Sequence, residues 1–146
     1  MAINKIGMLG AGTMGQGIAW ALAAAGKQVV LYDLKMEFIE RAIASIGKSL
    51  TKAEEKGKAT PGTKDTVISN IIGTDKFEDL KDVDFVVEGV FENMDVKKDV
   101  YTKLDALLAP EVIISTNTSS LSITEIAAIT KRPDKVVGMH FFNPAN

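Results

Sequence analysis

Short apolar runs alternate with longer segments of helical character along this chain. The runs predict strands at residues 5–9, 28–32, 84–88, 112–115 and 136–141, with a weaker strand at 71–73. Helix formers or apolar residues at helical spacing predict helices at 18–25, 35–56, 96–108 and 122–129, and a shorter helix that reaches Ile68. Because the runs are almost unbroken, their strands are expected to be covered on both faces. This alternation predicts a doubly wound, mainly parallel α/β sheet.

Composition places the chain among ordinary globular proteins. Its 146 residues are 46% hydrophobic and 25% charged, so residues 1–146 are expected to form one domain with its own core. The 17 basic and 19 acidic residues leave a net charge of −2, which argues against nucleic acid as a partner. With no cysteine and one histidine, the chain lacks the residues for a disulfide scaffold, a thiolate metal site or a multi-histidine metal centre.

The stretch from Ile6 to Gly26 carries no charge and superficially resembles a membrane span or a signal peptide. Its first half, however, is rich in glycine. A continuous helix would lose roughly 1 kcal/mol at each interior glycine. We therefore expect no membrane association, and the absence of cysteine fits a reducing, cytoplasmic compartment.

A glycine-rich loop links the first predicted strand to the first predicted helix. It matches G-x-G-x-x-G and consists of Gly10, Ala11, Gly12, Thr13, Met14 and Gly15. In a Rossmann-type dinucleotide site, the first glycine permits a tight turn, the second lets the backbone approach a pyrophosphate, and the third lets helix and strand pack closely. Asp33, at the end of the second predicted strand, would bind the adenosine ribose and repel a 2′-phosphate. The pattern predicts NAD rather than NADP; the alternative is a plain glycine-rich connection with Asp33 in a turn.

The only histidine, His140, lies near the end of the chain in a run of apolar residues. A lone histidine beside aromatic residues is often an ordinary core residue. A parallel sheet, however, places its functional crevice at the carboxyl ends of its strands. Asn117 and Ser119 follow the preceding predicted strand, and Asn143 lies just beyond His140. We expect these four side chains to converge beside the nicotinamide.

Four motifs occur in order along the chain: Gly-Ala-Gly-Thr-Met-Gly, then Val-Val-Glu with Phe-Glu-Asn, then Ser-Thr-Asn-Thr-Ser-Ser-Leu-Ser-Ile-Thr, and last Met-His-Phe-Phe-Asn-Pro. Together they resemble the 3-hydroxyacyl-CoA dehydrogenase family, and the similarity runs from Lys5 to Pro144. The resemblance implies an NAD-dependent oxidoreductase. Its expected reaction interconverts (S)-3-hydroxyacyl-CoA, in particular 3-hydroxybutyryl-CoA, and 3-oxoacyl-CoA.

The resemblance also implies roles for individual residues. His140 matches the catalytic histidine that takes the proton of the 3-hydroxyl group. Ser119 matches the serine that holds the substrate oxygen near the nicotinamide, and Asn117 and Asn143 match contacts to cofactor or substrate beside it. Imidazole suits a base that works near neutral pH. No G-x-S-x-G elbow surrounds Ser119, which argues against a hydrolase.

Glu92 and Lys97 occur in the pattern Glu-Asn-x-x-x-Lys. The resemblance implies that both line the cofactor cleft. From the residues alone, Glu92 is as well explained as an acid at the start of a helix, and Lys97 as a solvated lysine.

Lys48, Lys52 and Lys56 stand one helical turn apart on the predicted helix at 35–56, with Ser49 alongside. One explanation is a solvated helix face, because Glu54 and Glu55 are close in sequence. The other is a docking face for the phosphates of coenzyme A, since the resemblance matches Ser49, Lys52 and Lys56 to residues that bind the CoA-thioester substrate.

Members of the family are about twice as long as this chain. They carry a glutamate that pairs with the catalytic histidine and a helical domain that closes over the acyl chain and forms a homodimer or larger assembly. We therefore expect the chain to be truncated before that domain and to be nearly inactive alone. Two alternatives stay open: a dehydrogenase of another 3-hydroxy acid or sugar acid on the same fold, and a non-catalytic NAD-binding module.

Overall fold

The computed structural model describes residues 2–146 and contains a six-stranded sheet in which every strand pair is parallel. The strands are β1 (Lys5–Leu9), β2 (Gln28–Tyr32), β3 (Ile71–Thr74), β4 (Phe85–Glu88), β5 (Ile113–Thr116) and β6 (Val136–Gly138). Their order is β3-β2-β1-β4-β5-β6, so the chain starts in the middle of the sheet and winds first to one edge and then to the other. This order is that of a Rossmann-type fold and confirms the predicted doubly wound sheet.

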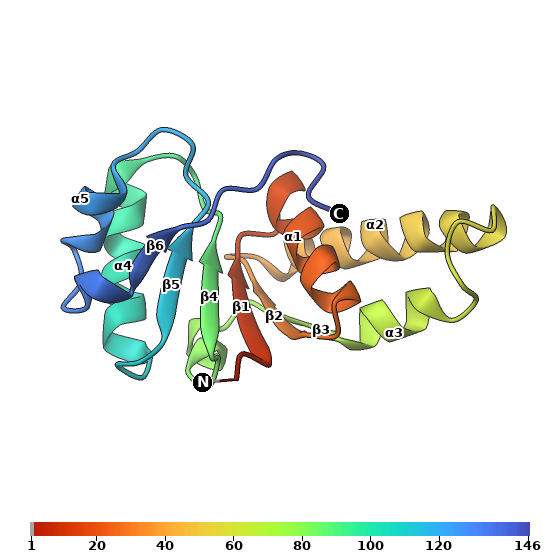
Figure 1. Ribbon diagram of the computed structural model, residues 1–146, viewed down its shortest axis with the longest axis horizontal. Helices are drawn as coiled ribbons and strands as arrows, with labels where there is room; N and C mark the ends of the chain where they lie inside the picture. Colours follow the sequence, from red (N-terminus) through yellow and green to blue (C-terminus); the bar gives the residue numbers. More distant parts are fainter. Residues whose placement is uncertain (1) are drawn as a thin grey trace.

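Helices cover both faces of the sheet. On one side lie α1 (Thr13–Ala24), α2 (Met36–Glu55) and α3 (Thr63–Ser69), and on the other lie α4 (Met94–Leu107) and α5 (Ile123–Ala127) (Figure 1). Two short 3₁₀ turns, η1 (Phe77–Leu80) and η2 (Pro133–Lys135), complete the described elements. Within residues 2–146, none of the helices combines the length and apolarity that a membrane crossing requires.

Each face of the sheet has its own apolar core. Met8 and Val87 belong to the core beneath α1 and α2, whereas their strand neighbours Leu9 and Val86 belong to the core beneath α4 and α5. Successive side chains of a strand point to opposite faces, so a strand with two buried faces needs apolar residues at every position. This explains the unbroken apolar runs of the sequence.

The structure differs from the predicted elements at two ends that matter for the site. Helix α1 begins at Thr13 rather than residue 18, because the Gln16 N–H already bonds the Gly12 carbonyl at 2.8 Å. Strand β6 ends at Gly138 rather than residue 141. The Met139 N–H still bonds the Thr116 carbonyl, but the next bond of this kind is made by a side chain of the loop after β5. The catalytic candidate His140 therefore lies beyond the strand.

The segment after β6 turns back across the carboxyl ends of the strands and reaches α1 (Figure 1). Phe141 and Ala145 pack against the core beneath α1. A methyl group on Gly17 would lie 3.3 Å from the Ala145 side chain, so this glycine permits the close approach of the segment to the helix. Residues 139–146 thus span the top of the sheet rather than extending away from it.

Arg132 links the C-terminal end of α4 to the loop before η2 through hydrogen bonds. Its guanidinium donates to the carbonyl oxygens of Asp105, Leu108 and Ala109, and it pairs with the Asp105 carboxylate at 2.7 Å. The last carbonyls of a helix have no partner within the helix, so Arg132 supplies the missing donors. Burial raises the pKa of Asp105, but bonds from the Lys131 N–H and from Arg132 outweigh it and hold that pKa below its usual value.

Replacing Arg132 with alanine should lower the free energy of unfolding by about 3 kcal/mol, because it removes the cation paired with a nearly buried carboxylate and the side-chain donors to the helix carbonyls. Urea denaturation followed by circular dichroism measures the change. The exposed neighbour Lys131 provides a matched control, since it reaches Asp105 through its backbone and Lys131→Ala keeps that bond. Equal stability of wild type and Arg132→Ala would contradict the assignment.

Candidate functional site

Two adjoining cavities open at the carboxyl ends of the strands. The first, of ≈ 380 Å³, is lined by Met14, Gly89, Val90, Glu92, Lys97, Asn117, Ser119, His140, Phe141, Phe142 and Asn143. The second, of ≈ 610 Å³, lies between the glycine loop, the end of β2 and α4. Gly89 and Val90 line both cavities, so the two spaces meet at the loop after β4.

The three glycines of the loop have different packing environments. Gly10 has a φ of 100° and lies under Gly89, whose carbonyl oxygen would be 2.5 Å from an added Cβ. At Gly15, an added Cβ would overlap the Gly10 carbonyl group. At Gly12, it would meet nothing within 4 Å. Gly10 and Gly15 thus allow the loop to pack, while Gly12 leaves open space in front of the backbone, which is what a dinucleotide pyrophosphate needs.

The start of α1 faces the second cavity without a capping side chain. Gly12 and Thr13 line this cavity, and within residues 2–146 no side chain caps the N-terminus of the helix. The first N–H groups of a helix point along its axis and carry its positive end, which favours an anionic ligand.

Asp33 lies beside this helix start. Its Oδ2 accepts a hydrogen bond from the Ala11 N–H at 2.7 Å, and its Oδ1 accepts one from the Leu34 N–H at 2.7 Å. Asp33 therefore stabilises the glycine loop as well as lining the cavity. Each carboxylate oxygen accepts more than one hydrogen bond, so both keep capacity for ribose hydroxyls.

A buried ion pair lies behind the wall of the first cavity, to which it contributes Lys97. Lys97 Nζ lies 2.8 Å from Glu88 Oε1 and 3.0 Å from Oε2, and the two side chains are 1% and 0% exposed. Tyr101 and Thr116 donate their hydroxyls to Glu88 Oε2, and the Val90 N–H donates to Oε1. Burial and the neighbouring Glu88 charge raise the pKa of Tyr101, so its phenol stays protonated as a donor.

Hydrogen bonds extend this ion pair to the loop after β5. The Thr118 hydroxyl donates to Glu92 Oε2 at 2.7 Å, and Lys97 Nζ lies 3.5 Å from Glu92 Oε1. The Thr118 N–H in turn donates to Thr116, which bonds Glu88. Burial raises the pKa of Glu92, but its hydrogen bonds and Lys97 outweigh it and hold that pKa below its usual value. The result is a closed ring of polar contacts joining β4, α4 and β5.

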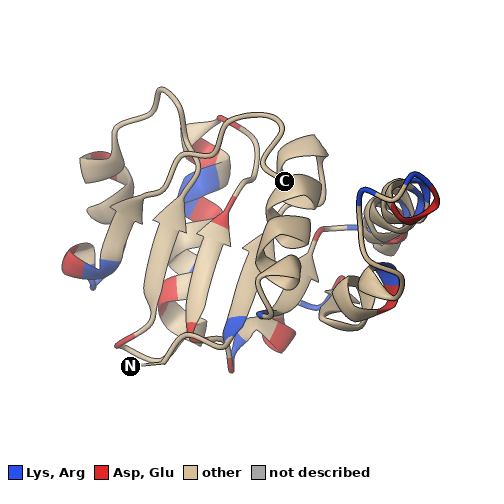
Figure 2. Cartoon of the chain, turned by 45° about the vertical axis from the view of Figure 1, so that its right-hand side comes forward, with Lys and Arg blue, Asp and Glu red and all other residues tan. Residues whose placement is uncertain are grey.

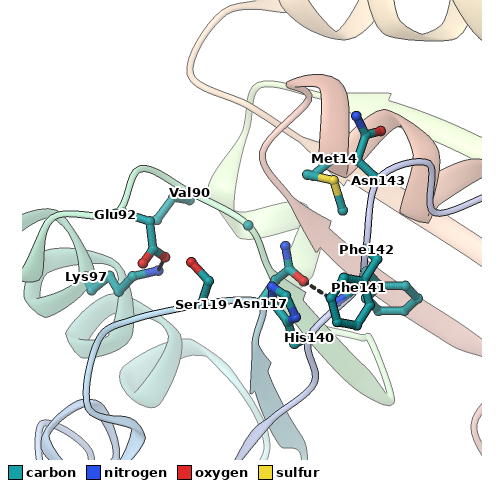
Figure 3. Close-up of a pocket in the computed structure, with 11 residues that line it drawn as sticks. Met14, Val90, Glu92, Lys97, Asn117, Ser119, His140, Phe141, Phe142 and Asn143 are labelled. Atoms are coloured by element: carbon teal, nitrogen blue, oxygen red, sulfur yellow. Dashed lines mark hydrogen bonds and ion pairs between the residues drawn. The ribbon is translucent and has the colours of Figure 1, made fainter.

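The loop after β5 and the segment after β6 face each other across the first cavity (Figure 3). Asn117 Oδ1 accepts a hydrogen bond from the Phe141 N–H at 2.7 Å, which leaves the Asn117 amide nitrogen free to donate. His140 is exposed and stacks edge-on against Phe142, with ring centroids 4.8 Å apart. Ser119, also exposed, lies between Asn117 and the Lys97–Glu92 pair.

The structure brings most predicted site residues together. Met14, Glu92, Lys97, Asn117, Ser119, His140 and Asn143 line the first cavity, and Gly10, Ala11, Gly12, Thr13 and Asp33 line the second. Gly15 lines neither, because it is buried under the loop. Ser49 and Lys52 on α2 and Lys56, the residue directly after it, are exposed and line neither cavity; charged residues gather along the C-terminal end of α2 in Figure 2.

Glu88, Tyr101, Thr116 and Thr118 are not among the site residues predicted from the sequence. A solvated surface, one of the two explanations of Lys97, is wrong because the side chain is 1% exposed. A usable signal was present: a glutamate ends an apolar strand, and a lysine and a tyrosine follow at helical spacing on the next helix. A charge in that position requires a buried partner.

Comparison with known proteins identifies the family. Residues 5–146 match the family model described as "3-hydroxyacyl-CoA dehydrogenase, NAD binding domain". The chain belongs to this family. It is 49% identical over 140 residues to a 3-hydroxybutyryl-CoA dehydrogenase of Clostridioides difficile, and 43% identical over 144 residues to a probable 3-hydroxybutyryl-CoA dehydrogenase of Bacillus subtilis. These matches cover 96% and 99% of this chain, which spans about half the length of the curated relatives it matches.

Solved structures from the 3-hydroxyacyl-CoA dehydrogenase family agree. The chain superposes on a 3-hydroxybutyryl-CoA dehydrogenase of Escherichia coli with a TM-score of 0.97 at 39% identity, covering 99% of this chain and 31% of that one. For an (S)-3-hydroxybutyryl-CoA dehydrogenase of Ralstonia eutropha, the TM-score is 0.95 at 41% identity, with 99% and 51% covered. The fold and the family make NAD the cofactor of this domain, and the open space at Gly12 and the uncapped α1 fit a dinucleotide.

Two glycine substitutions separate binding from packing. Gly12→Ala should change the free energy of unfolding by at most about 1 kcal/mol. It should weaken NADH binding about tenfold, because the methyl group fills the space in front of the loop. Gly15→Ala should instead destabilise the fold by about 2 kcal/mol or more through its overlap with Gly10. Thermal denaturation and NADH calorimetry measure both effects, and the reverse pattern would refute the two roles.

Proposed function

We propose that this chain is the NAD-binding part of an enzyme that interconverts (S)-3-hydroxyacyl-CoA and 3-oxoacyl-CoA, with 3-hydroxybutyryl-CoA as the favoured substrate. The observation that carries the proposal is the convergence of Asn117, Ser119, His140 and Asn143 on one cavity that adjoins the cavity of the glycine loop. The substrate class is supported by the names of relatives 41–49% identical to this chain.

The two cavities divide the cofactor between them in this proposal. Gly12 and the start of α1 would hold the pyrophosphate, and Asp33 would bind the adenosine ribose. Gly89, Val90, Glu92 and Lys97 would hold the nicotinamide half at the first cavity. Bound there, NAD supplies the acceptor for the hydride that leaves the substrate carbon.

The side chains of the first cavity hold and move the proton. In oxidation, His140 takes the proton from the 3-hydroxyl group, and in reduction its imidazolium returns that proton. The Ser119 hydroxyl bonds the same substrate oxygen and stabilises the charge that develops on it. Asn117, through its amide nitrogen, and Asn143 orient substrate and cofactor from the two facing segments of the cavity. The exposure of His140 leaves its ring accessible to a ligand.

Taken alone, the 146-residue chain is proposed to bind NAD but to turn over CoA thioesters slowly. Among residues 2–146, no side chain makes a hydrogen bond or ion pair to the His140 imidazole, so nothing in this part fixes its orientation beyond the contact with Phe142. An exposed ring also leaves the reacting oxygen open to water.

Nucleotide titration tests the core of the proposal. NADH should quench the fluorescence of the single tryptophan, Trp20 on α1, saturably and at concentrations about tenfold lower than NADPH, because Asp33 repels a 2′-phosphate. Asp33→Asn should reduce the difference between the NADH and NADPH concentrations needed for quenching. Asp65→Asn, on the exposed side of α3, should leave that difference unchanged. Equal quenching by both nucleotides, or none from a folded sample, would overturn the cofactor assignment.

The lysines of α2 test the substrate class. Lys56→Glu should raise the Kd of acetoacetyl-CoA for the NADH-bound chain about fivefold, because it replaces attraction to a CoA phosphate with repulsion at an exposed position. NADH affinity should stay unchanged. Lys81→Glu reverses an equally exposed charge beyond η1 and serves as the control. If calorimetry finds the same Kd for all three proteins, the lysines form only a solvated face.

A further inference from the structure

Glu88 carries the densest set of polar contacts near the site, yet it does not face either cavity. Its carboxylate accepts five hydrogen bonds, from the Val90 N–H, twice from Lys97, and from the hydroxyls of Tyr101 and Thr116. Each of these groups donates to Glu88, so both carboxylate oxygens act as acceptors within the protein. The hydrogen bonds of the Glu88 carboxylate are therefore made within the protein, and Glu88 does not contact a ligand directly.

Lys97 differs from Glu88 because it does line the first cavity. Two of its contacts go to Glu88, and the third, at 3.5 Å, goes to Glu92 at the cavity wall. An ammonium group has three N–H donors, so the contacts with Glu88 aim the remaining one at the cavity side. A buried ammonium without a counter-charge is costly and favours the neutral amine. Glu88 is therefore the nearest counter-charge of the buried Lys97 ammonium, and its two contacts fix the direction of the N–H that remains for the cavity side.

We propose that Glu88 is a positioning residue for cofactor binding: it holds the Lys97 ammonium charged and aimed at the nicotinamide half of NAD. The identity of the ligand in this inference rests on the proposed function. The charge and direction of the Lys97 ammonium do not depend on it. The ring of contacts through Thr116, Thr118 and Glu92 also links Glu88 to the loop that carries Ser119. Glu88 thus acts on the site entirely through other residues.

Glu88→Gln tests the proposal with little change of shape. The glutamine removes the charge and turns one oxygen into an NH₂ group that faces donors, so Lys97 loses its principal counter-ion. The NADH Kd should rise about tenfold, the size expected for the loss of one charge-assisted hydrogen bond. Tyr101→Phe is the matched control: it removes one hydrogen bond to Glu88 and keeps the ion pair, so the Kd should stay within about twofold of wild type.

A spectroscopic measurement reports on Lys97 directly. In ¹⁵N-lysine-labelled protein, the wild type and Tyr101→Phe should show a protected Lys97 ammonium resonance, assigned by its loss in Lys97→Met. In Glu88→Gln that resonance should disappear or move to the neutral-amine position. The titratable groups facing Lys97 are Glu88 from β4, Glu92 from the following loop and Tyr101 from α4, with His140 across the cavity, so the spectra are compared at one pH.

A double-mutant cycle completes the test. If Glu88 acts through Lys97, Glu88→Gln should add nothing to the loss of NADH affinity in a Lys97→Met background. Additive losses, or an unchanged Lys97 resonance in Glu88→Gln, would overturn the inference while leaving the proposed function intact. A folded wild type that does not bind NADH would refute the proposed function and the ligand assigned to Lys97; the resonance would then decide whether Glu88 controls the charge of Lys97.

Discussion

Burial of both faces of the parallel sheet is the constraint on which the rest of this molecule depends. Because Met8 and Leu9 belong to opposite cores, the strands have no free face on which to carry chemistry. All strands run the same way, so their carboxyl ends and the loops that follow meet at one edge. The glycine loop, Glu88, Asn117 and His140 all lie at or just beyond a strand end for this reason.

Glu88 is the last residue of β4 and lies between the apolar core and the site. It pairs in register with Leu9 on one side and Thr116 on the other, so a charge stands where the sheet otherwise buries apolar residues. Lys97 and Tyr101, one turn apart on α4, donate the hydrogen bonds that offset the cost of burying this charge. Apolar replacement of such a pair is often neutral for stability. Stability alone therefore does not account for the pair, and the proposed fixing of the Lys97 cation at the cavity wall gives it a role.

Sequence alone predicted the elements whose pattern is local. The runs at β1 and β2, the G-x-G-x-x-G loop and Asp33 depend on neighbours along the chain, and the structure has them where expected. The pairing of Glu88 with Lys97 depends on how α4 is rotated against β4, which no local pattern specifies. The end of β6 was misplaced because its apolar run continues, whereas a side chain of another loop ends the backbone pairing.

That side chain belongs to Asn117. The hydrogen bond that it accepts from Phe141 stands where a further backbone bond between β5 and β6 would otherwise lie. A backbone hydrogen bond between two strands does not depend on the side chains, whereas a hydrogen bond made by a side chain is lost when that residue is replaced. Asn117, which lies outside the regular sheet, thus contributes directly to the position of His140. Substitution at position 117 would therefore shift the His140 imidazole by small steps without rebuilding the sheet beneath it.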